Sequence, residues 1–132
     1  MAMAGMHQRG PGTILLAEDE ALLRELGETI LRQAGYTVLS VSGRDELNAL
    51  LNSSCNDVDV ILTDIAMPQI SGHQLSTLAK QRWPRARVIF MSGYSNEEIP
   101  ELEGNGAFLQ KPFTPAELMV MVRKVIEEAP PS

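Results

Sequence analysis

The chain has 132 residues, of which 44% are hydrophobic and 21% charged, and its formal net charge is −6. This length suits one domain with a substantial core, and the acidic balance gives no support to direct binding of nucleic acid. No apolar run approaches the roughly 18 residues that cross a bilayer, and no secretory signal is visible. The single cysteine, Cys55, excludes an internal disulfide. Together these observations predict a cytoplasmic protein without membrane insertion.

The first β-α unit brings three acidic residues next to a predicted strand. Residues 1–12 contain glycine and proline without apolar periodicity and are expected to form a flexible leader. Thr13–Ala17 is a short apolar run that predicts a buried strand, and residues 18–20 are all acidic. Leucines at helical spacing then predict a helix that ends at Gly35. Acidic residues at a helix start interact favourably with the helix dipole, which on its own would explain one or two of the three.

A second β-α unit follows. Residues 36–41 are rich in aromatic and β-branched side chains and predict a strand. Ser42 with Asp45 three residues later fits the capping-box pattern and predicts the start of a helix whose apolar side includes Leu47.

The stretch from Val58 to Gly72 carries the strongest functional signal. Residues 60–62 are apolar and of high strand propensity, as in a strand buried on both faces of a parallel sheet. The run ends at Asp64, and the pairs Met67-Pro68 and Ser71-Gly72 break regular structure. Ligands of open α/β sheets bind at the carboxyl ends of strands, which makes Asp64 a candidate functional residue; the alternative is an ordinary turn or capping residue.

The next unit is clear at its beginning and unclear at its end. Ser71 with Gln74 predicts a helix start, and residues 88–91 predict a fourth strand that ends in Ser92. The following segment has little periodicity and contains Pro100, so only a short or irregular fourth helix is expected there.

The last unit has the clearest helix start. Residues 107–109 predict a fifth strand, which is followed closely by Lys111. Thr114 is expected to cap the final helix, with Pro115 at its first position and Glu117 completing the capping box. The domain is expected to span residues 13–128, which leaves 129–132 as a tail.

Strands and helices that alternate in this way predict an α/β fold with a doubly wound, five-stranded parallel sheet of flavodoxin-like type, strand order 2-1-3-4-5, and helices on both faces. The carboxyl ends of four strands then present Glu18 with Asp19, Asp64, Ser92 and Lys111 at one edge. Carboxylates are ligands for Mg²⁺, and a cation with an ammonium group would offset their repulsion. A metal, a hydroxyl and an ammonium around one carboxylate can stabilise a phosphoryl group in transfer, with Asp64 as the nucleophile that forms an acyl phosphate.

Four segments, in order and each at a predicted strand end, resemble the receiver domains of two-component response regulators. They are Leu15–Glu20, Asp64–Pro68 with Gly72, Met91–Gly93 and Lys111–Phe113. Two longer segments around the last two, Phe90–Tyr94 and Phe108–Phe113, are similar to receivers attached to hybrid sensor histidine kinases. The resemblance implies a signalling switch with intrinsic phosphotransfer and autophosphatase activity, whose partner is a histidine kinase or a histidine phosphotransfer domain.

The resemblance also implies residue roles at the metal and the phosphoacceptor. Asp64 would take a phosphoryl group from a phosphohistidine and, with Glu18, Asp19 and the main-chain carbonyl of Ala66, would help hold Mg²⁺.

Two further side chains would complete the phosphoryl site. Ser92 would bond a phosphoryl oxygen, and Lys111 would pair with its charge. Phe108 matches the aromatic position that changes rotamer on activation; the alternative is an ordinary core residue of the fifth strand.

Other readings on the same fold are less well supported. A flavin or nucleotide module would need a glycine-rich loop where this chain has acids. A phosphohydrolase with an aspartyl-phosphate intermediate would need an acid two residues after the nucleophile, where this chain has Ala66. A degenerate receiver would bind a partner without phosphorylation, although every chemical part is present here.

Overall fold

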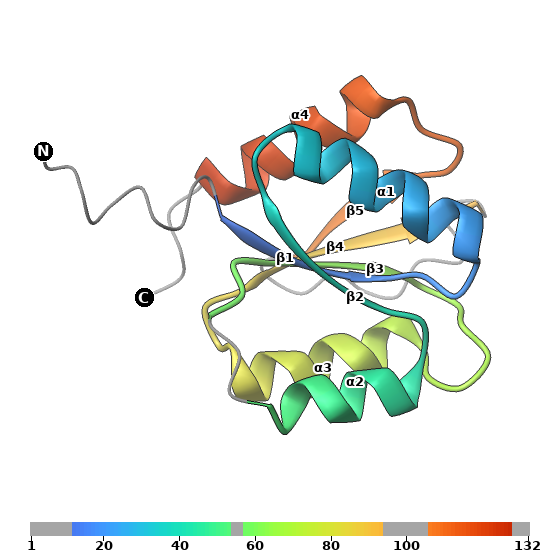
Figure 1. Ribbon diagram of the computed structural model, residues 1–132, viewed down its shortest axis with the longest axis vertical. Coiled ribbons are helices and arrows are strands. Elements are labelled where there is room, and N and C mark those ends of the chain that lie inside the picture. The colour runs from blue at the N-terminus through green and yellow to red at the C-terminus, as the bar shows by residue number, and fades with distance from the viewer. Residues whose placement is uncertain (1–11, 54–56, 94–105, 128–132) are drawn as a thin grey trace, which may run out of the picture.

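The apolar runs of the sequence form one parallel sheet with a pair of helices on each face (Figure 1). The structure is a computed structural model that describes residues 12–53, 57–93 and 106–127. The strands are β1 Thr13–Ala17, β2 Thr37–Val41, β3 Val60–Asp64, β4 Arg87–Ser92 and β5 Gly106–Gln110. The helices are α1 Ala21–Gln33, α2 Arg44–Leu51, α3 Gly72–Arg82 and α4 Pro115–Glu127.

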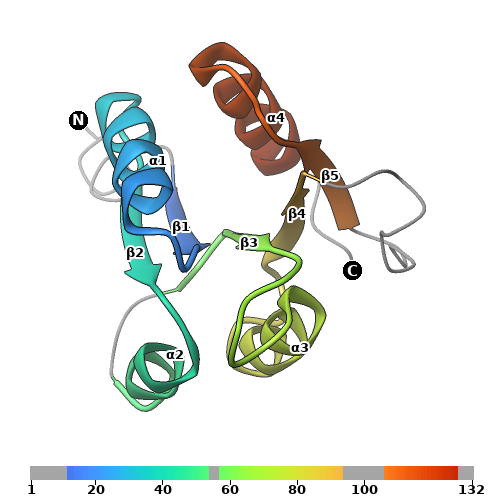
Figure 2. The same cartoon turned by 90° about the vertical axis from the view of Figure 1, so that its right-hand side faces the viewer.

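The strand order is β2-β1-β3-β4-β5, and every neighbouring pair is parallel. Helices α1 and α4 cover one face and α2 and α3 the other, and Figure 2 looks onto the edge where the strands end. The predicted flavodoxin-like doubly wound sheet is therefore confirmed.

Side chains alternate between two cores because the central strands are covered on both faces. In β1, Ile14 and Leu16 belong to the core under α1 and α4, whereas Leu15 and Ala17 belong to the core over α2 and α3. All four are at most 2% exposed. This double burial explains why the strands are continuous apolar runs rather than alternating patterns.

Two of the three predicted capping boxes are confirmed. The Ser71 hydroxyl accepts from the Gln74 N–H at 3.0 Å, and the Gln74 side chain accepts from the Ser71 N–H at 3.1 Å. The same reciprocal pair joins Thr114 and Glu117 at 3.0 and 2.8 Å. These caps satisfy backbone donors that the first helical turn leaves without partners.

The capping box expected at Ser42 is wrong. Helix α2 begins at Arg44 with Gly43 as its N-cap, and a glycine has no side chain that could bond the first turn of the helix. Instead, the Gln69 side-chain oxygen accepts from the Arg44 N–H at 3.2 Å. Glu46 accepts from the Ser42 N–H at 2.6 Å, one residue beyond capping-box spacing. An oxygen from the loop after β3 therefore takes the place of a local cap.

Several predicted features lie outside the described residues. They are the leader, apart from Gly12, the short fourth helix expected around Pro100, and the tail. Within the part of the chain that is described, no helix combines the length and hydrophobicity needed to span a bilayer.

Candidate functional site

The strand register brings the predicted residues to one edge of the sheet. Ala17 of β1 lies opposite Thr63 of β3, so the acids that follow β1 lie beside Asp64. Ser92 of β4 lies opposite Gln110 of β5, and the main chain of the next residue, Lys111, donates its N–H to the Ser92 carbonyl at 2.8 Å. The site thus forms where four adjacent strands end.

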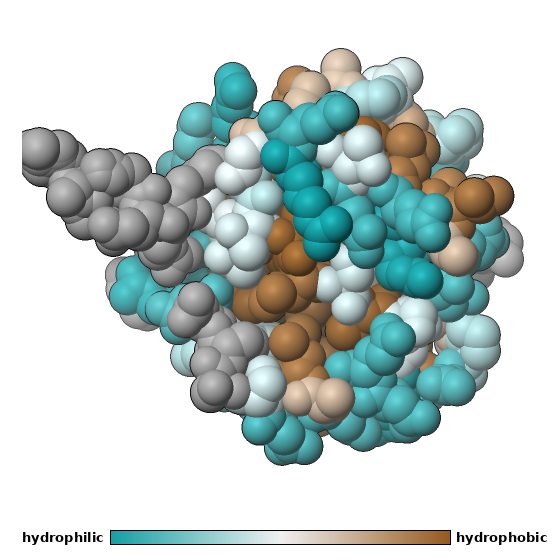
Figure 3. Space-filling view, viewed as in Figure 1, coloured by the Kyte–Doolittle hydropathy of each residue, from teal (hydrophilic) through white to brown (hydrophobic). Residues whose placement is uncertain are grey.

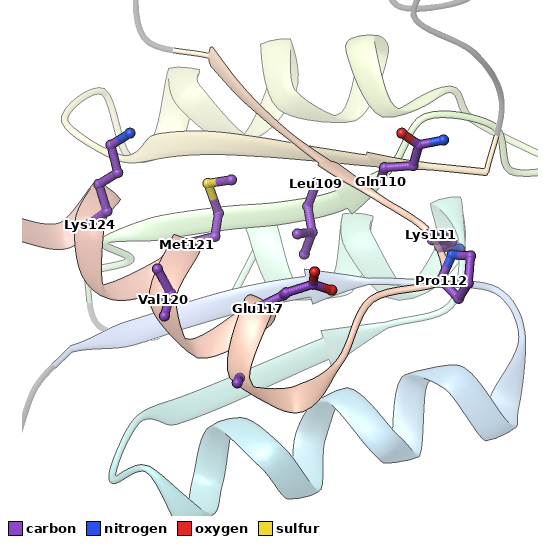
Figure 4. A pocket seen from close by; sticks show the side chains of 9 residues that line it. Leu109, Gln110, Lys111, Pro112, Glu117, Val120, Met121 and Lys124 are labelled. Atoms are coloured by element: carbon purple, nitrogen blue, oxygen red, sulfur yellow. The ribbon is translucent and has the colours of Figure 1, made fainter.

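Lys111 connects the acidic residues. Its Nζ lies 2.8 Å from Glu18 Oε1 and 3.2 Å from Asp64 Oδ2 and donates a hydrogen bond to each. Figure 4 shows Lys111 and Pro112 where β5 passes into the loop that leads to α4; the peptide bond between them is cis. The ammonium group therefore joins the ends of β1, β3 and β5.

Glu18 is held as a buried carboxylate. The residue is 2% exposed, and a charge so far from water needs partners. Lys111 bonds Oε1, and the N–H of Glu20 donates to Oε2 at 3.2 Å. The Arg24 guanidinium fixes the turn by donating to the Glu18 carbonyl at 2.9 Å. Both carboxylate oxygens thus have donors.

Only one of the three acids stands at the start of helix α1. Helix α1 begins at Ala21, and its first turn contains no acidic residue. Glu20 is the N-cap, but its side chain makes no capping bond. Glu18 and Asp19 precede the helix, and their carboxylates lie in one cluster with Asp64.

The three carboxylates form a candidate metal centre. Glu18, Asp19 and Asp64 each offer an oxygen, and these atoms lie within 4.8 Å of one another. Oxygen ligands at this spacing suit a hard divalent cation such as Mg²⁺. The residues present therefore fit the metal that the sequence predicts.

Lys111 is kept charged by its surroundings. Burial alone would lower the pKa of its ammonium group, but the hydrogen bond to Glu18 and the charge of Asp64 outweigh burial, and the net pKa is raised above the usual 10.5. The charge of Lys111 offsets part of the repulsion among the three carboxylates.

A close backbone approach fixes the loop after Asp64. The Ile65 N–H donates to the Met91 carbonyl at 2.9 Å, and the Gly72 N–H donates to the Ile65 carbonyl at 2.7 Å. A Cβ at position 72 would lie 2.3 Å from the Asp64 carbonyl oxygen, so only glycine fits. Gly72 thus closes the loop over the end of β3.

The remaining predicted residues lie around this centre. Ser92 is buried at the end of β4, and Ala66 is exposed in the loop after β3. Phe108 of β5 lies opposite Phe90 of β4 and is partly buried against the core on the α2–α3 face.

Sequence reasoning missed two residues that shape the site. Arg24 fixes the acidic turn from the first turn of α1, and a basic residue at that place was its only signal. Gly72 was read as a helix-breaking residue and as a motif position, but its steric role comes from a backbone contact that a single sequence does not show.

Comparison with known proteins gives a consistent result. The model of the response regulator receiver domain family matches residues 14–123. The sensor kinase CckA of Brucella abortus is 30% identical over 122 residues, which cover 90% of this chain and 13% of that protein. The hydrogenase transcriptional regulatory protein HoxA of Cupriavidus necator is 35% identical over 124 residues, covering 87% and 24%. The chain thus spans less than a quarter of the length of these curated relatives.

Solved structures agree with the fold. The receiver domain of the hybrid histidine kinase CckA superposes with a TM-score of 0.76 at 30% identity, over 88% of this chain and all of the other. A response regulator receiver protein from Sinorhizobium medicae gives a TM-score of 0.72 at 31% identity, over 87% of this chain and 94% of the other.

Proposed function

The chain belongs to the family of response regulator receiver domains, and from this premise we propose that Asp64 accepts a phosphoryl group from a phosphohistidine of a partner protein. One observation carries the proposal: the Lys111 ammonium lies 2.8 Å from Glu18 and 3.2 Å from Asp64, and the Asp19 carboxylate joins the same cluster. Residues up to 93 positions apart in sequence thus meet around one side-chain carboxylate.

In the proposed step, a carboxylate oxygen of Asp64 attacks the phosphorus atom. The O–P bond of an acyl phosphate forms while the N–P bond of the phosphohistidine breaks, and the imidazole nitrogen keeps the electron pair. The nucleophile in this step is the Asp64 carboxylate, and the Lys111 ammonium lies 3.2 Å from its Oδ2. The Asp64 side chain is 15% exposed at the end of β3, so a part of it remains open to a phosphoryl donor.

Glu18, Asp19 and Asp64, with the main-chain carbonyl of Ala66, would hold Mg²⁺. When bound, the ion supplies positive charge that offsets the carboxylates and the phosphoryl oxygens. The fit rests on the 4.8 Å spacing of the carboxylate oxygens and on the oxygen-only donor set.

Lys111 and Ser92 act on the phosphoryl group in this proposal. The ammonium would give up its hydrogen bonds to Glu18 and Asp64 and donate to a phosphoryl oxygen, and the Ser92 hydroxyl would donate to another. Ser92 and Lys111 are joined through the main chain at 2.8 Å, so a shift of one displaces the other. Phe108 lies on β5, two residues before Gln110, and would change its rotamer when Ser92 and Lys111 shift.

We propose that the partner is the helical phosphohistidine domain of a histidine kinase or a histidine phosphotransfer protein in the cytoplasm, rather than nucleic acid. Helix α1 begins directly after the acidic residues and exposes Leu22, Leu23 and Leu26 at 81%, 40% and 51%. Figure 3 shows hydrophobic side chains among the hydrophilic surface of this face. Leucines this exposed beside a reactive centre favour protein docking.

The test uses acetyl phosphate with Mg²⁺ and intact-mass measurement. The chain is expected to gain the mass of one phosphoryl group, and Asp64→Asn is expected to gain none. The control is Asp57→Asn, which changes an exposed acid just before the same strand and should be phosphorylated like the wild type. Absence of the mass gain in the wild type, or its persistence in Asp64→Asn, would contradict the proposal.

A further inference from the structure

A mainly apolar cavity lies directly behind the candidate site. Its volume is about 480 Å³, within the range of small-molecule sites. It opens between α1 and α4, and its walls include Leu16, Leu23, Gly27, Leu62, Phe113 and Leu118. Most of its lining is hydrophobic, and it is separate from the carboxylate cluster except at two shared residues.

Those two residues are Glu18 and Lys111, the charged groups of the cavity wall. They already bond each other at 2.8 Å, and Glu18 Oε2 accepts from the Glu20 N–H. A ligand that entered the cavity would therefore meet apolar surface and a charge pair that is already satisfied. This chemistry suits an uncharged apolar molecule, because a charged ligand would need a counter-charge that the wall does not offer.

Gly27 keeps the cavity open on the α1 side. It lies in the middle of a helix, where glycine costs about 1 kcal/mol relative to alanine. A Cβ at this position would come within 3.1 Å of Leu16 Cδ2, and Leu16 itself lines the cavity. A side chain at position 27 would thus press on Leu16 and displace it toward the cavity that both residues line.

We propose that this cavity is a regulatory site for a small, uncharged, apolar molecule, and that its occupancy opposes phosphorylation of Asp64. The regulatory part rests on the proposed function. A ligand in the cavity excludes water from the Glu18–Lys111 pair, and a lower local dielectric strengthens that ion pair. Lys111 must release Glu18 and Asp64 when it pairs with a phosphoryl oxygen, and the bound ligand makes that release more costly.

The coupling between the cavity and the site must also affect the binding of Mg²⁺. A cation held by Glu18, Asp19 and Asp64 competes with Lys111 for two of the same carboxylates, Glu18 and Asp64. A ligand that favours the Lys111–Glu18 contact therefore weakens Mg²⁺ binding, and Mg²⁺ weakens ligand binding by an equal factor.

The probe for the test is indole, titrated into the ¹⁵N-labelled chain while the amide signals of Gly27 and Leu118 are followed by NMR. We expect saturable shifts at both residues. With saturating Mg²⁺, the affinity for indole should fall by about fivefold or more, at the lower end of typical allosteric couplings. Bound indole should also slow phosphorylation by acetyl phosphate.

Substitutions test the location of the site. Gly27→Leu fills the cavity and should abolish the saturable shifts at Leu118. Gly27→Ala, which requires only a small movement of Leu16, should weaken binding if the larger variant does not fold. The control is Thr29→Leu, which adds apolar bulk to an exposed position of α1 outside the cavity and should bind indole like the wild type.

The proposal is overturned if indole gives no saturable shift, if both Gly27 variants bind it normally, or if Mg²⁺ leaves its affinity unchanged. It is also overturned if a second copy of the chain, or a phosphohistidine domain, covers Gly27 and Leu118 while indole does not bind. Failure of the proposed function has a different result: acetyl phosphate would not modify Asp64 even without indole, while indole binding would remain measurable.

Discussion

Replacement of Gly72 by alanine should damage the site although it adds a single methyl group. The new Cβ would lie 2.3 Å from the Asp64 carbonyl oxygen and 3.0 Å from Ile65 Cα. Both atoms are backbone, so no side-chain rotation relieves the contact. The main chain at Asp64 must move by at least about 0.7 Å to restore an acceptable separation in a close-packed region.

This displacement has two expected costs. Overpacking of a well-packed site typically destabilises a protein by about 1–3 kcal/mol, which urea unfolding would detect. The carboxylate of Asp64 moves with its backbone, and a shift approaching 1 Å lowers the rate of a positioned reaction by about 10- to 100-fold. Phosphorylation by acetyl phosphate should slow accordingly, even at temperatures where Gly72→Ala is fully folded.

Gly93→Ala is the matched control. Gly93 follows Ser92 at the same edge of the sheet, but a Cβ there meets no atom within 4 Å. Its stability and phosphorylation rate should remain near those of the wild type. If Gly72→Ala were as stable and as fast as Gly93→Ala, the steric explanation for the glycine would be refuted.

Three further predictions concern the charge, the caps and the loop. Lys111→Met leaves Glu18 as a buried carboxylate without its cation, and breaking such a pair typically costs about 3–5 kcal/mol of unfolding free energy. The folded-state pKa of Lys111 is raised above 10.5, so the stability that Lys111 adds to the wild type should be fully present below pH 10.5 and decline as the pH rises through the folded-state pKa. Urea unfolding of both proteins as a function of pH would measure this difference. Ser71→Ala removes the bond to the Gln74 N–H and should cost about 1 kcal/mol of unfolding free energy, with no loss if the cap is unimportant. Ala66→Asn introduces an amide that can orient a water molecule and should shorten the lifetime of the phosphorylated chain in mass spectrometry; an unchanged lifetime would contradict this role for the position.

Local patterns in the sequence predicted most of the fold. Continuous apolar runs located the strands because both faces of the sheet are covered, and Thr114–Glu117 predicted the start of α4 because that cap is built from neighbouring residues. The cap of α2 was predicted wrongly because its acceptor, Gln69, lies 25 residues from Arg44 and no local pattern signals it. A cap built from neighbouring residues was thus predictable, whereas a cap supplied by a distant loop was not.

The sequence predicted which charged residues form the candidate site, but not the residues and the cavity that surround them. Glu18, Asp64 and Lys111 could be brought together because the ends of parallel strands share one edge. The role of Arg24 depends on the path of the turn before α1, and the cavity beside Gly27 depends on how α1 and α4 diverge over the sheet. These are three-dimensional relations that follow only after the helices are placed.

The long separation of Lys111 from its partners also has a consequence during synthesis. Glu18 leaves the ribosome 93 residues ahead of the lysine that neutralises it, and its burial is unfavourable until β5 has joined the sheet. A nascent chain that ends before β5 holds the acids but lacks Lys111. The Glu18–Lys111 ion pair, and the burial of Glu18 that depends on it, therefore become possible only after nearly the whole domain has been synthesised.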